Sequence, residues 1–472
     1  MATFATVLFR CSVFLLLLFQ LFSAAAATGG SYSRVKYLPG YSGPLPFQLE
    51  TGYVGVGDSD QFQIFHYFIK SEANPKTDPL IIWLTGGPGC SALSGLAFEI
   101  GPISFGEESN EGSIPRLILN PYSWTKKCSI IFVDLPAGTG FSYDTTSSTF
   151  KPGDFNQIHH YLQFLRKWFV DHPEFTTNPF YIGGDSYSGM IVPVVAQKIV
   201  EGNTHDFSFI NFQGYILGNP YTIRDSGDNF AIPFAHRMTL ISDELFESLK
   251  TSCKGKYVNI DPSNAECLRH YETYKKCISK VEPANILDPK CQFQSPKQQQ
   301  DVYDRRSLNS ISKSLLDQST PLSFRSCPEF KYKLSNDWAN ADQVRKALHI
   351  REGSIGEWIR CKNGKEMYTF ELDTVFPYHV NLSSKGYRSL IYSGDHDMLV
   401  PHLDTQAWIK ALNYSIVDDW RPWFILDQVA GYTRYYANKM TFATIKGGGH
   451  TAEYTKRECS IMFSRWISGQ SL

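Results

Sequence analysis

The sequence predicts an α/β protein with a mostly parallel, twisted sheet, and three observations support this prediction. Short, strongly apolar runs of strand length recur along the chain, and several of them end in loops rich in glycine and proline. Stretches with apolar residues at helical spacing separate these runs, which indicates alternating strands and helices. A polar segment, residues 240–335, interrupts the alternation and predicts an inserted cap.

The predicted elements follow one another in a regular order. Strands are expected at residues 61–69, 79–84, 129–134, 179–182, 210–217, 389–394, 420–429 and 440–445. Helices are expected at residues 155–170, at 190–200 and at 458–467. The run at 79–84 is apolar throughout, which is typical of an inner strand that is buried on both faces.

Length and charge limit the classes of function. A chain of 472 residues can bury a large core, so its stability requires no metal. The formal net charge of -1 argues against nucleic acid or anionic lipid as a bulk electrostatic partner. No Cys-x-x-Cys pair or Cys/His cluster has zinc spacing, so we expect neither a metal nor a cofactor. The sequence carries no indication of the oligomeric state.

The first 27 residues predict a cleavable secretory signal. Arg10 precedes a short apolar run at residues 13–19, and four alanines follow at residues 24–27. The run is too short to span a bilayer, and no later stretch is long and apolar enough to do so. The sequence therefore predicts a secretory-pathway protein without a membrane anchor.

Cysteines and glycosylation sequons agree with that route. Ten cysteines less Cys11 of the signal leave nine, an odd count that implies at least one free thiol among disulfides. Two sequons predict glycosylation, at Asn381 and Asn413. The predicted domains are a signal at 1–27, a core at 28–239 and 336–472, and a disulfide-stapled, largely helical cap at 240–335.

One stretch, residues 179–189, organises the predicted chemistry. An apolar strand ends in two glycines, Ser186 stands between Asp185 and Tyr187, and a helical pattern follows. A strand that turns sharply into a helix with serine at the apex is the nucleophile elbow of the α/β-hydrolase fold. The usual glycine two residues after the serine is replaced by Ser188. Taken alone, the stretch also fits a turn serine or a helix N-cap.

The order of later motifs favours a nucleophile. In α/β-hydrolases the acid and then the base follow the serine, each on a loop at the carboxyl edge of the sheet. Asp395 comes directly after a predicted strand, and His450 follows another strand and three glycines. Asp397 is the rival acid but lies further from the strand end. We therefore expect Ser186, Asp395 and His450 as the catalytic triad, with no metal involved.

The oxyanion of the tetrahedral intermediate needs two backbone N–H donors. One is expected from Tyr187, the residue after the nucleophile. The other is expected from the glycine-rich loop after the strand at 79–84, where Gly86 and Gly87 stand.

Five ordered motifs resemble the serine carboxypeptidase family: residues 84–91, 138–143, 184–189, 394–397 and 447–451. The resemblance implies the same triad, with the N–H groups of Gly87 and Tyr187 as the oxyanion hole. It also implies three disulfides and three unpaired cysteines. These are Cys90–Cys361, Cys253–Cys267 and Cys291–Cys327, with Cys128, Cys277 and Cys459 unpaired.

Two departures from the peptidases of this family suggest another reaction. Those peptidases grip the substrate carboxylate with an asparagine before the Gly-Gly pair and a glutamate before the serine, supported by a second glutamate. The corresponding substrate-binding residues are here Thr85, Gly86, Glu99 and Asp185. Each buried hydrogen bond lost weakens a carboxylate grip by about 1–3 kcal/mol.

The altered motifs resemble the plant branch of the family, which contains acyltransferases. That resemblance implies transfer of an acyl group from a 1-O-acyl-glucose ester to an alcohol-type acceptor, in the vacuole or outside the cell. The partners would then be a small-molecule acyl donor and acceptor. One alternative is a serine-type carboxypeptidase active at acid pH, and another is a non-catalytic secreted binding protein that kept the fold.

Overall fold

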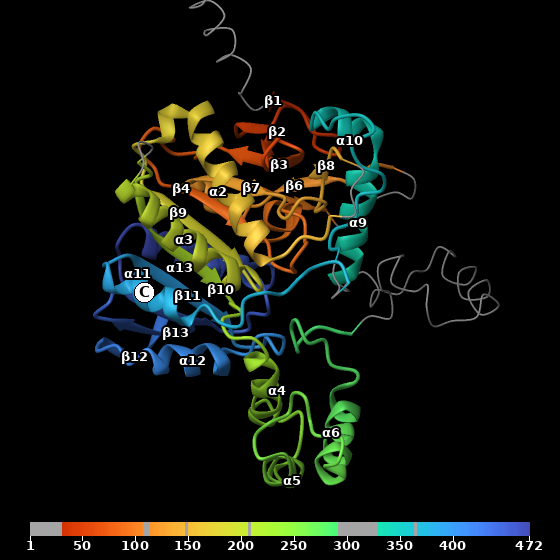
Figure 1. Ribbon diagram of the computed structural model, residues 1–472, viewed down its shortest axis with the longest axis vertical. Helices are drawn as coiled ribbons and strands as arrows, with labels where there is room; N and C mark the ends of the chain where they lie inside the picture. The colour runs from red at the N-terminus through yellow and green to blue at the C-terminus, as the bar shows by residue number, and fades with distance from the viewer. Residues whose placement is uncertain (1–30, 107–112, 147–149, 206–208, 291–327, 363–365) are drawn as a thin grey trace, which may run out of the picture.

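The computed structural model describes residues 31–106, 113–146, 150–205, 209–290, 328–362 and 366–472. The predicted signal and the predicted Cys291–Cys327 disulfide lie outside these residues. Figure 1 shows one large α/β body from which a small helical lobe projects.

The body is built on a twelve-stranded mixed sheet with a parallel centre. The parallel strands are, in spatial order, β7 (Ser129–Val133), β4 (Leu80–Leu84), β9 (Phe180–Asp185), β10 (Phe212–Gly218), β11 (Arg388–Gly394) and β14 (Met440–Ile445). Antiparallel strands extend both edges. They are β1 (Ser31–Val35), β2 (Leu49–Val56), β3 (Phe62–Ile69) and β8 (Tyr143–Asp144) at one edge, and β13 (Gln428–Tyr436) and β12 (Ile416–Ile425) at the other.

Helices cover both faces of this sheet, as predicted for an α/β protein. One face carries α2 (Asp154–Asp171), α3 (Ser188–His205), α11 (Phe376–Ser384) and α12 (His402–Ala411). The other carries the short helix η1 (Gly95–Glu99), α9 (Pro328–Asn340), α10 (Asp342–Ala347) and α13 (Lys456–Ile467). Shorter elements complete the body: β5 (Ile103–Phe105), β6 (Leu117–Leu119), η2 (Trp124–Lys126), η3 (Pro173–Phe175) and η4 (Ala452–Thr455).

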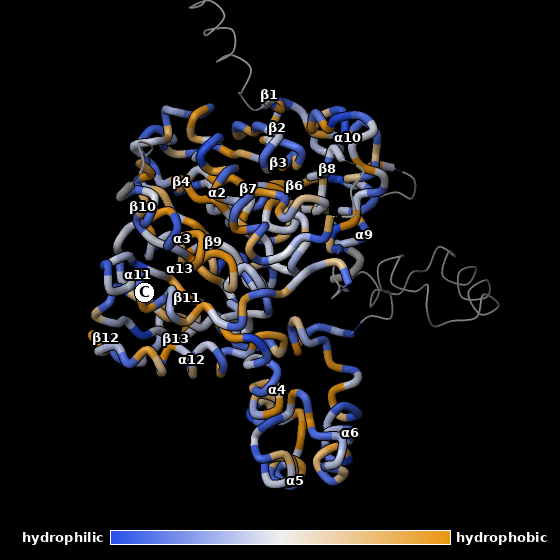
Figure 2. Tube along the Cα trace, viewed as in Figure 1, coloured by the Kyte–Doolittle hydropathy of each residue, from blue (hydrophilic) through white to orange (hydrophobic). Residues whose placement is uncertain are grey.

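Strand β4 illustrates why the inner strands are apolar throughout. Its side chains alternate between the two faces, so Ile82 packs in one core while Trp83 packs in the other. Both residues are fully buried, so a charged side chain at either position would lose its hydration. In Figure 2 hydrophobic colour runs through the interior of the body, on strands such as β9 and on the helix α3 beside it.

The projecting lobe contains α4 (Ser226–Arg237), α5 (Asp243–Cys253) and α6 (Ala265–Ile278) (Figure 1). It has a small apolar core of its own, which includes Ile232 of α4 together with Leu249 and Tyr274. The lobe thus begins before the predicted cap boundary at residue 240. Helix α9, at the other end of the predicted cap, packs on the main body, where Trp338 Nε1 donates to the Pro39 carbonyl at 2.7 Å.

The disulfides Cys90–Cys361 and Cys253–Cys267 are present, as predicted. Cys128, Cys277 and Cys459 form no disulfide within the described residues. The two sequon asparagines have exposed side chains, and their glycosylation stays a prediction.

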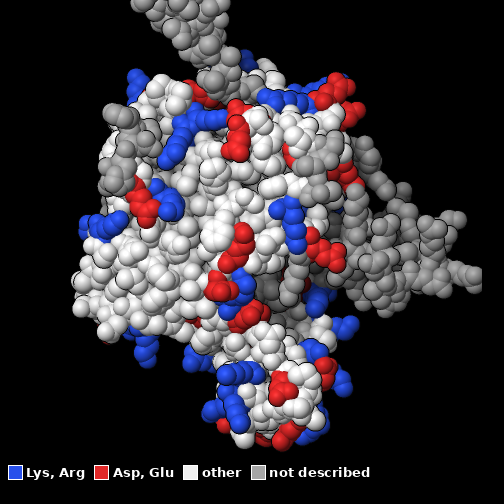
Figure 3. Space-filling model, in the orientation of Figure 1, with Lys and Arg blue, Asp and Glu red and all other residues white. Residues whose placement is uncertain are grey.

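Surface charge and the apolar character of the helices both bear on which partners the protein can have. Figure 3 shows charges of both signs interspersed on the visible face, in line with the net charge of -1. No helix of the described part of the chain has the length and apolar character needed to cross a membrane.

Candidate active site

Ser186 occupies a strained turn between β9 and α3. Its φ of 53° lies in the left-handed region, which residues other than glycine rarely adopt. Two backbone hydrogen bonds hold the turn: Ser186 N–H donates to the Gly218 carbonyl at 3.0 Å, and Tyr221 N–H donates to the Ser186 carbonyl at 2.9 Å. The unusual Ser188 donates its hydroxyl to the Leu84 carbonyl at 2.7 Å, so it ties the elbow to β4.

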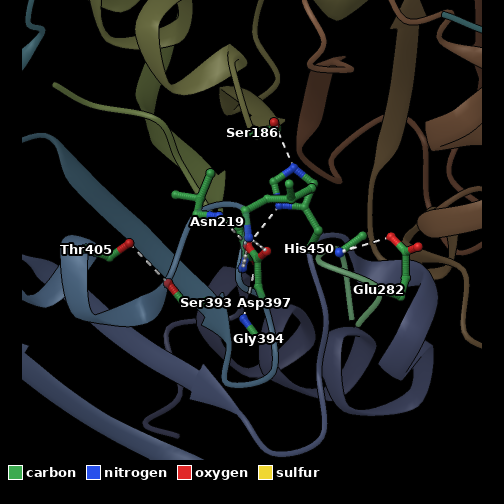
Figure 4. Close-up of polar contacts among 11 residues, drawn as sticks. Ser186, Asn219, Glu282, Ser393, Gly394, Asp397, Thr405 and His450 are labelled. Carbon is green, nitrogen blue, oxygen red and sulfur yellow. Dashed lines mark hydrogen bonds and ion pairs between the residues drawn. The ribbon is translucent and has the colours of Figure 1, made fainter. Parts of the chain in front are cut away.

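His450 lies beside the serine. Its Nε2 is 2.8 Å from Ser186 Oγ, and its Nδ1 is 2.8 Å from Asp397 Oδ2 (Figure 4). A serine hydroxyl, an imidazole and a carboxylate in this line can pass the serine proton to the imidazole and stabilise the imidazolium.

The carboxylate in this line is Asp397, so the prediction of Asp395 is wrong. Asp395 does follow β11 directly, but its Oδ1 accepts hydrogen bonds from Gly447 N–H at 2.7 Å and from His396 Nδ1 at 2.5 Å. It therefore braces the base of the glycine-rich loop that carries His450. The chain turns for two more residues before a carboxylate points at the imidazole.

Asp397 is fully buried and has an unusually complete set of donors. Besides His450, it accepts from Asn219 Nδ2 at 2.7 Å, Leu399 N–H at 2.8 Å and Val400 N–H at 3.3 Å. These donors offset the cost of burying its charge.

Asn219 was missed by the sequence interpretation. It also accepts from Gly394 N–H at 3.2 Å, and so joins the carboxyl ends of β10 and β11 (Figure 4). Its signal was available: it is a polar residue directly after a strand, at the same edge as the other site residues.

Burial and charge act in opposite directions on His450. Burial lowers the pKa of the imidazole, but the charge and hydrogen bond of Asp397, together with more distant carboxylates, more than offset this effect, and the pKa ends above its usual value of 6.5. The negative charge of Asp185 adds to the increase. The unprotonated imidazole of His450, which is the form that acts as a base, therefore predominates only at a pH above the usual pKa of histidine.

The glycine loop after β4 touches the elbow. A Cβ on Gly86 would lie 2.7 Å from Ser186 Cβ, so only glycine fits there. Gly86 N–H is already used, because it donates to Asp185 Oδ1 at 2.9 Å. Within the described residues the N–H groups of Gly87 and Tyr187 donate to no protein acceptor, and both are available for an oxyanion. One such donor is typically worth about 100- to 1,000-fold in kcat.

The remaining predicted binding residues are buried near the elbow, and Thr85, Glu99 and Asp185 are here called the acidic wall. Glu99 and Asp185 are 3% and 1% exposed, and they lie close enough for the charge of Asp185 to act on Glu99. Burial raises the pKa of Glu99 well above its usual value, and the Asp185 charge raises it further. Burial also raises the pKa of Asp185, and the Gly86 N–H that donates to this carboxylate partly opposes the increase.

Three buried oxygens of this wall have no conventional partner within the described residues. They are Thr85 Oγ1, Asp185 Oδ2 and Glu99 Oε2. All three oxygens can accept a hydrogen bond and the Thr85 hydroxyl can also donate one, so a ligand hydroxyl suits them. Binding of substrate by Thr85, Gly86, Glu99 and Asp185 stays a prediction.

The chain that returns from the lobe, residues 282–286, supports both catalytic loops. Ala284 carbonyl accepts from His450 N–H at 2.7 Å, and Pro283 carbonyl accepts from Met398 N–H at 2.9 Å. Glu282 in turn accepts from Ala284 N–H at 3.3 Å (Figure 4). Across the described ranges, no group of His, Cys, Asp or Glu side chains is arranged to hold a metal ion.

An elbow serine aligned with a histidine and an aspartate, at the carboxyl edge of a mostly parallel sheet, defines a serine hydrolase of the α/β-hydrolase fold. The fold prediction is confirmed by the crystal structure of KEX1(delta)P, a prohormone-processing carboxypeptidase from Saccharomyces cerevisiae. The two structures superpose with a TM-score of 0.70 at 20% identity, over 92% of this chain and 95% of that one.

The chain belongs to the serine carboxypeptidase family, whose sequence model matches residues 39–469. Serine carboxypeptidase-like 19 from Arabidopsis thaliana is 54% identical over 445 residues, covering 93% of this chain and 94% of the relative. Serine carboxypeptidase-like 2 from the same plant is 52% identical over 459 residues, covering 97% of each chain. The resemblance drawn from the five motifs is therefore confirmed at the level of the family.

Proposed function

We propose that this family member is an acyltransferase of the secretory pathway, in the vacuole or outside the cell. It moves an acyl group from a 1-O-acyl-glucose ester to an alcohol-type acceptor through an acyl-enzyme on Ser186. His450 acts as general base and acid, and Asp397 orients the imidazole and stabilises its charged form. The N–H groups of Gly87 and Tyr187 bind the oxyanion.

The reaction has two balanced halves. Ser186 Oγ attacks the ester carbonyl while its proton passes to His450 Nε2, and the tetrahedral intermediate then expels glucose, which takes that proton. The acceptor hydroxyl next gives its proton to His450 and attacks the acyl-enzyme, and Ser186 recovers a proton as the product ester leaves. Transfer exceeds hydrolysis when the acceptor is held in line and water is excluded, a proximity effect of several kcal/mol.

The observation that supports this proposal is the small number of hydrogen-bond donors around Glu99 and Asp185. A carboxypeptidase site must offer several N–H or O–H donors to a terminal carboxylate, whereas Thr85 supplies one hydroxyl where the peptidases have an amide with two N–H groups. The unpartnered Asp185 Oδ2 is an acceptor, and the single Thr85 hydroxyl can donate or accept. Glucose presents hydroxyl groups, which donate as readily as they accept, and it suits this wall better than a second carboxylate.

The second candidate is a carboxypeptidase active at acid pH. The raised pKa of Glu99 favours it, because a carboxyl group that keeps its proton can donate to a substrate carboxylate. The reading of the chain as a non-catalytic binding protein is opposed by the aligned Ser186, His450 and Asp397.

The test compares two substrates on the purified protein. One sample receives 1-O-benzoyl-glucose with a pool of alcohols, and the other receives an N-blocked dipeptide, with Ser186→Ala as the inactive control. The proposal requires benzoyl esters of an acceptor in the first sample. Release of the C-terminal amino acid in the second, with no ester product in the first, would establish the peptidase instead.

A further inference from the structure

One buried carboxylate close to the elbow has no part in the mechanism above. Asp154 is the first residue of α2 and is fully buried. Its Oδ2 accepts from Glu371 N–H at 2.6 Å and Leu372 N–H at 2.8 Å, and its Oδ1 accepts from the phenol of Tyr187 at 2.7 Å. Hydrogen bonds to an ionised acceptor are the strong ones, so this carboxylate is a rigid anchor point.

Tyr187 belongs both to this network and to the oxyanion hole. Its N–H shares a planar peptide bond with the Ser186 carbonyl, which accepts from Gly189 N–H at 3.0 Å and Tyr221 N–H at 2.9 Å. Those two bonds hold one end of the peptide plane. The other end is the Tyr187 Cα, whose side chain is tied to Asp154.

A neighbouring phenol provides a built-in comparison. Tyr368 also lies against Asp154 Oδ1, at 2.9 Å, but its hydroxyl is 2.7 Å from Gln157 Oε1 as well. The rings of Tyr187 and Tyr368 pack edge to face at 5.9 Å. Burial raises the pKa of the Tyr187 phenol, so it stays a proton donor over the working range of the enzyme.

We propose that Asp154 is a positioning residue for catalysis: through the phenol of Tyr187 it holds the Tyr187 N–H in the direction that the oxyanion requires. Oxyanion donors are effective because they are aimed before the reaction, and a hydrogen bond weakens steeply when its angle is lost. The inference rests on Ser186 as the nucleophile, which is the part of the proposed function that transfer and peptide hydrolysis share.

The experiment compares Tyr187→Phe with the matched variant Tyr368→Phe, since each removes one phenol from the same carboxylate oxygen. Turnover of p-nitrophenyl acetate, the rate of fluorophosphonate labelling and the affinity for an alkylboronic acid are measured, together with the Tm. For Tyr187→Phe we expect kcat and boronic acid affinity to fall together by about tenfold, with KM changed less than about twofold. Tyr368→Phe should lower the Tm about as much as Tyr187→Phe does. Its kcat should stay within about threefold of the wild-type value.

Equal losses of kcat in the two variants, or a lower Tm without a lower kcat in Tyr187→Phe, would show that the network only stabilises the fold. A rise in KM for the ester without a matching loss of boronic acid affinity would overturn the proposal as well. Fluorophosphonate labelling gives the same comparison if the wild type turns over the ester slowly. A protein that hydrolyses dipeptides but transfers no acyl group would refute the proposed function. The expected difference in kcat between Tyr187→Phe and Tyr368→Phe would stay the same.

Discussion

Replacement of Asp397 by asparagine tests the catalytic line most directly. The substitution removes the charge 2.8 Å from His450 Nδ1 and places an amide among donors that all require an acceptor. The imidazolium formed during acyl transfer then lacks its counter-charge, and a single amide oxygen cannot replace both carboxylate oxygens as acceptors. Loss of the acid in a serine triad with geometry retained lowers kcat by about 10⁴-fold, or about 5.4 kcal/mol at 1.36 kcal/mol per decade.

Asp395→Asn is the matched control, because it removes a carboxylate two residues away in the same loop. Its amide oxygen still accepts from Gly447 N–H, so the loop keeps its brace and we expect less than about a tenfold loss of kcat. The assay is the rate of fluorophosphonate labelling and p-nitrophenyl ester turnover, with circular dichroism to verify folding. Comparable losses in the two variants, or an Asp397→Asn enzyme with more than about a tenth of wild-type kcat, would refute the assignment.

Three further predictions concern pH and specificity. First, kcat/KM should rise with pH through a midpoint above 6.5, because the pKa of His450 is raised; Asp185→Asn should move that midpoint to lower pH, and an unchanged midpoint contradicts the coupling. Second, burial lowers the pKa of His66 to about 3, so the unfolded state gains protons first and stability falls as the pH drops below 6.5. In urea unfolding, His66→Phe should therefore reduce the stability lost between pH 7 and pH 4.5 by about 2 kcal/mol, and an equal loss in wild type and variant excludes this origin. Third, Thr85→Asn restores two amide donors and should raise dipeptide hydrolysis relative to acyl transfer by about tenfold, one hydrogen bond's worth; an unchanged ratio argues against a role for Thr85.

Much of the fold could be predicted because its signals are local. The apolar run of β4, the glycine-rich loop after it and the strand–serine–helix pattern at Ser186 each occupy a few consecutive residues. His450 was also identified, because a strand followed by three glycines marks a loop at the carboxyl edge of the sheet.

The same reasoning could not identify the acid of the catalytic triad. Asp395 and Asp397 lie in one loop, and distance from the strand end favours the first. Their side chains nevertheless point to different partners, since the turn after β11 directs Asp395 to Gly447 N–H and Asp397 to His450 and Asn219. Asn219 comes from β10, and no sequence spacing relates it to either aspartate.

By itself, the sequence determined the α/β class and the elbow at Ser186, because apolar periodicity and turn chemistry are properties of neighbouring residues, and the resemblance of its five motifs indicated the family. Only the tertiary structure decided that Asp397 holds the imidazole, that Glu99 is buried within reach of the Asp185 charge, and that Asp154 anchors Tyr187. Each of these contacts joins groups from separate loops or helices, and the direction of a side chain at such a junction is set by how the elements pack.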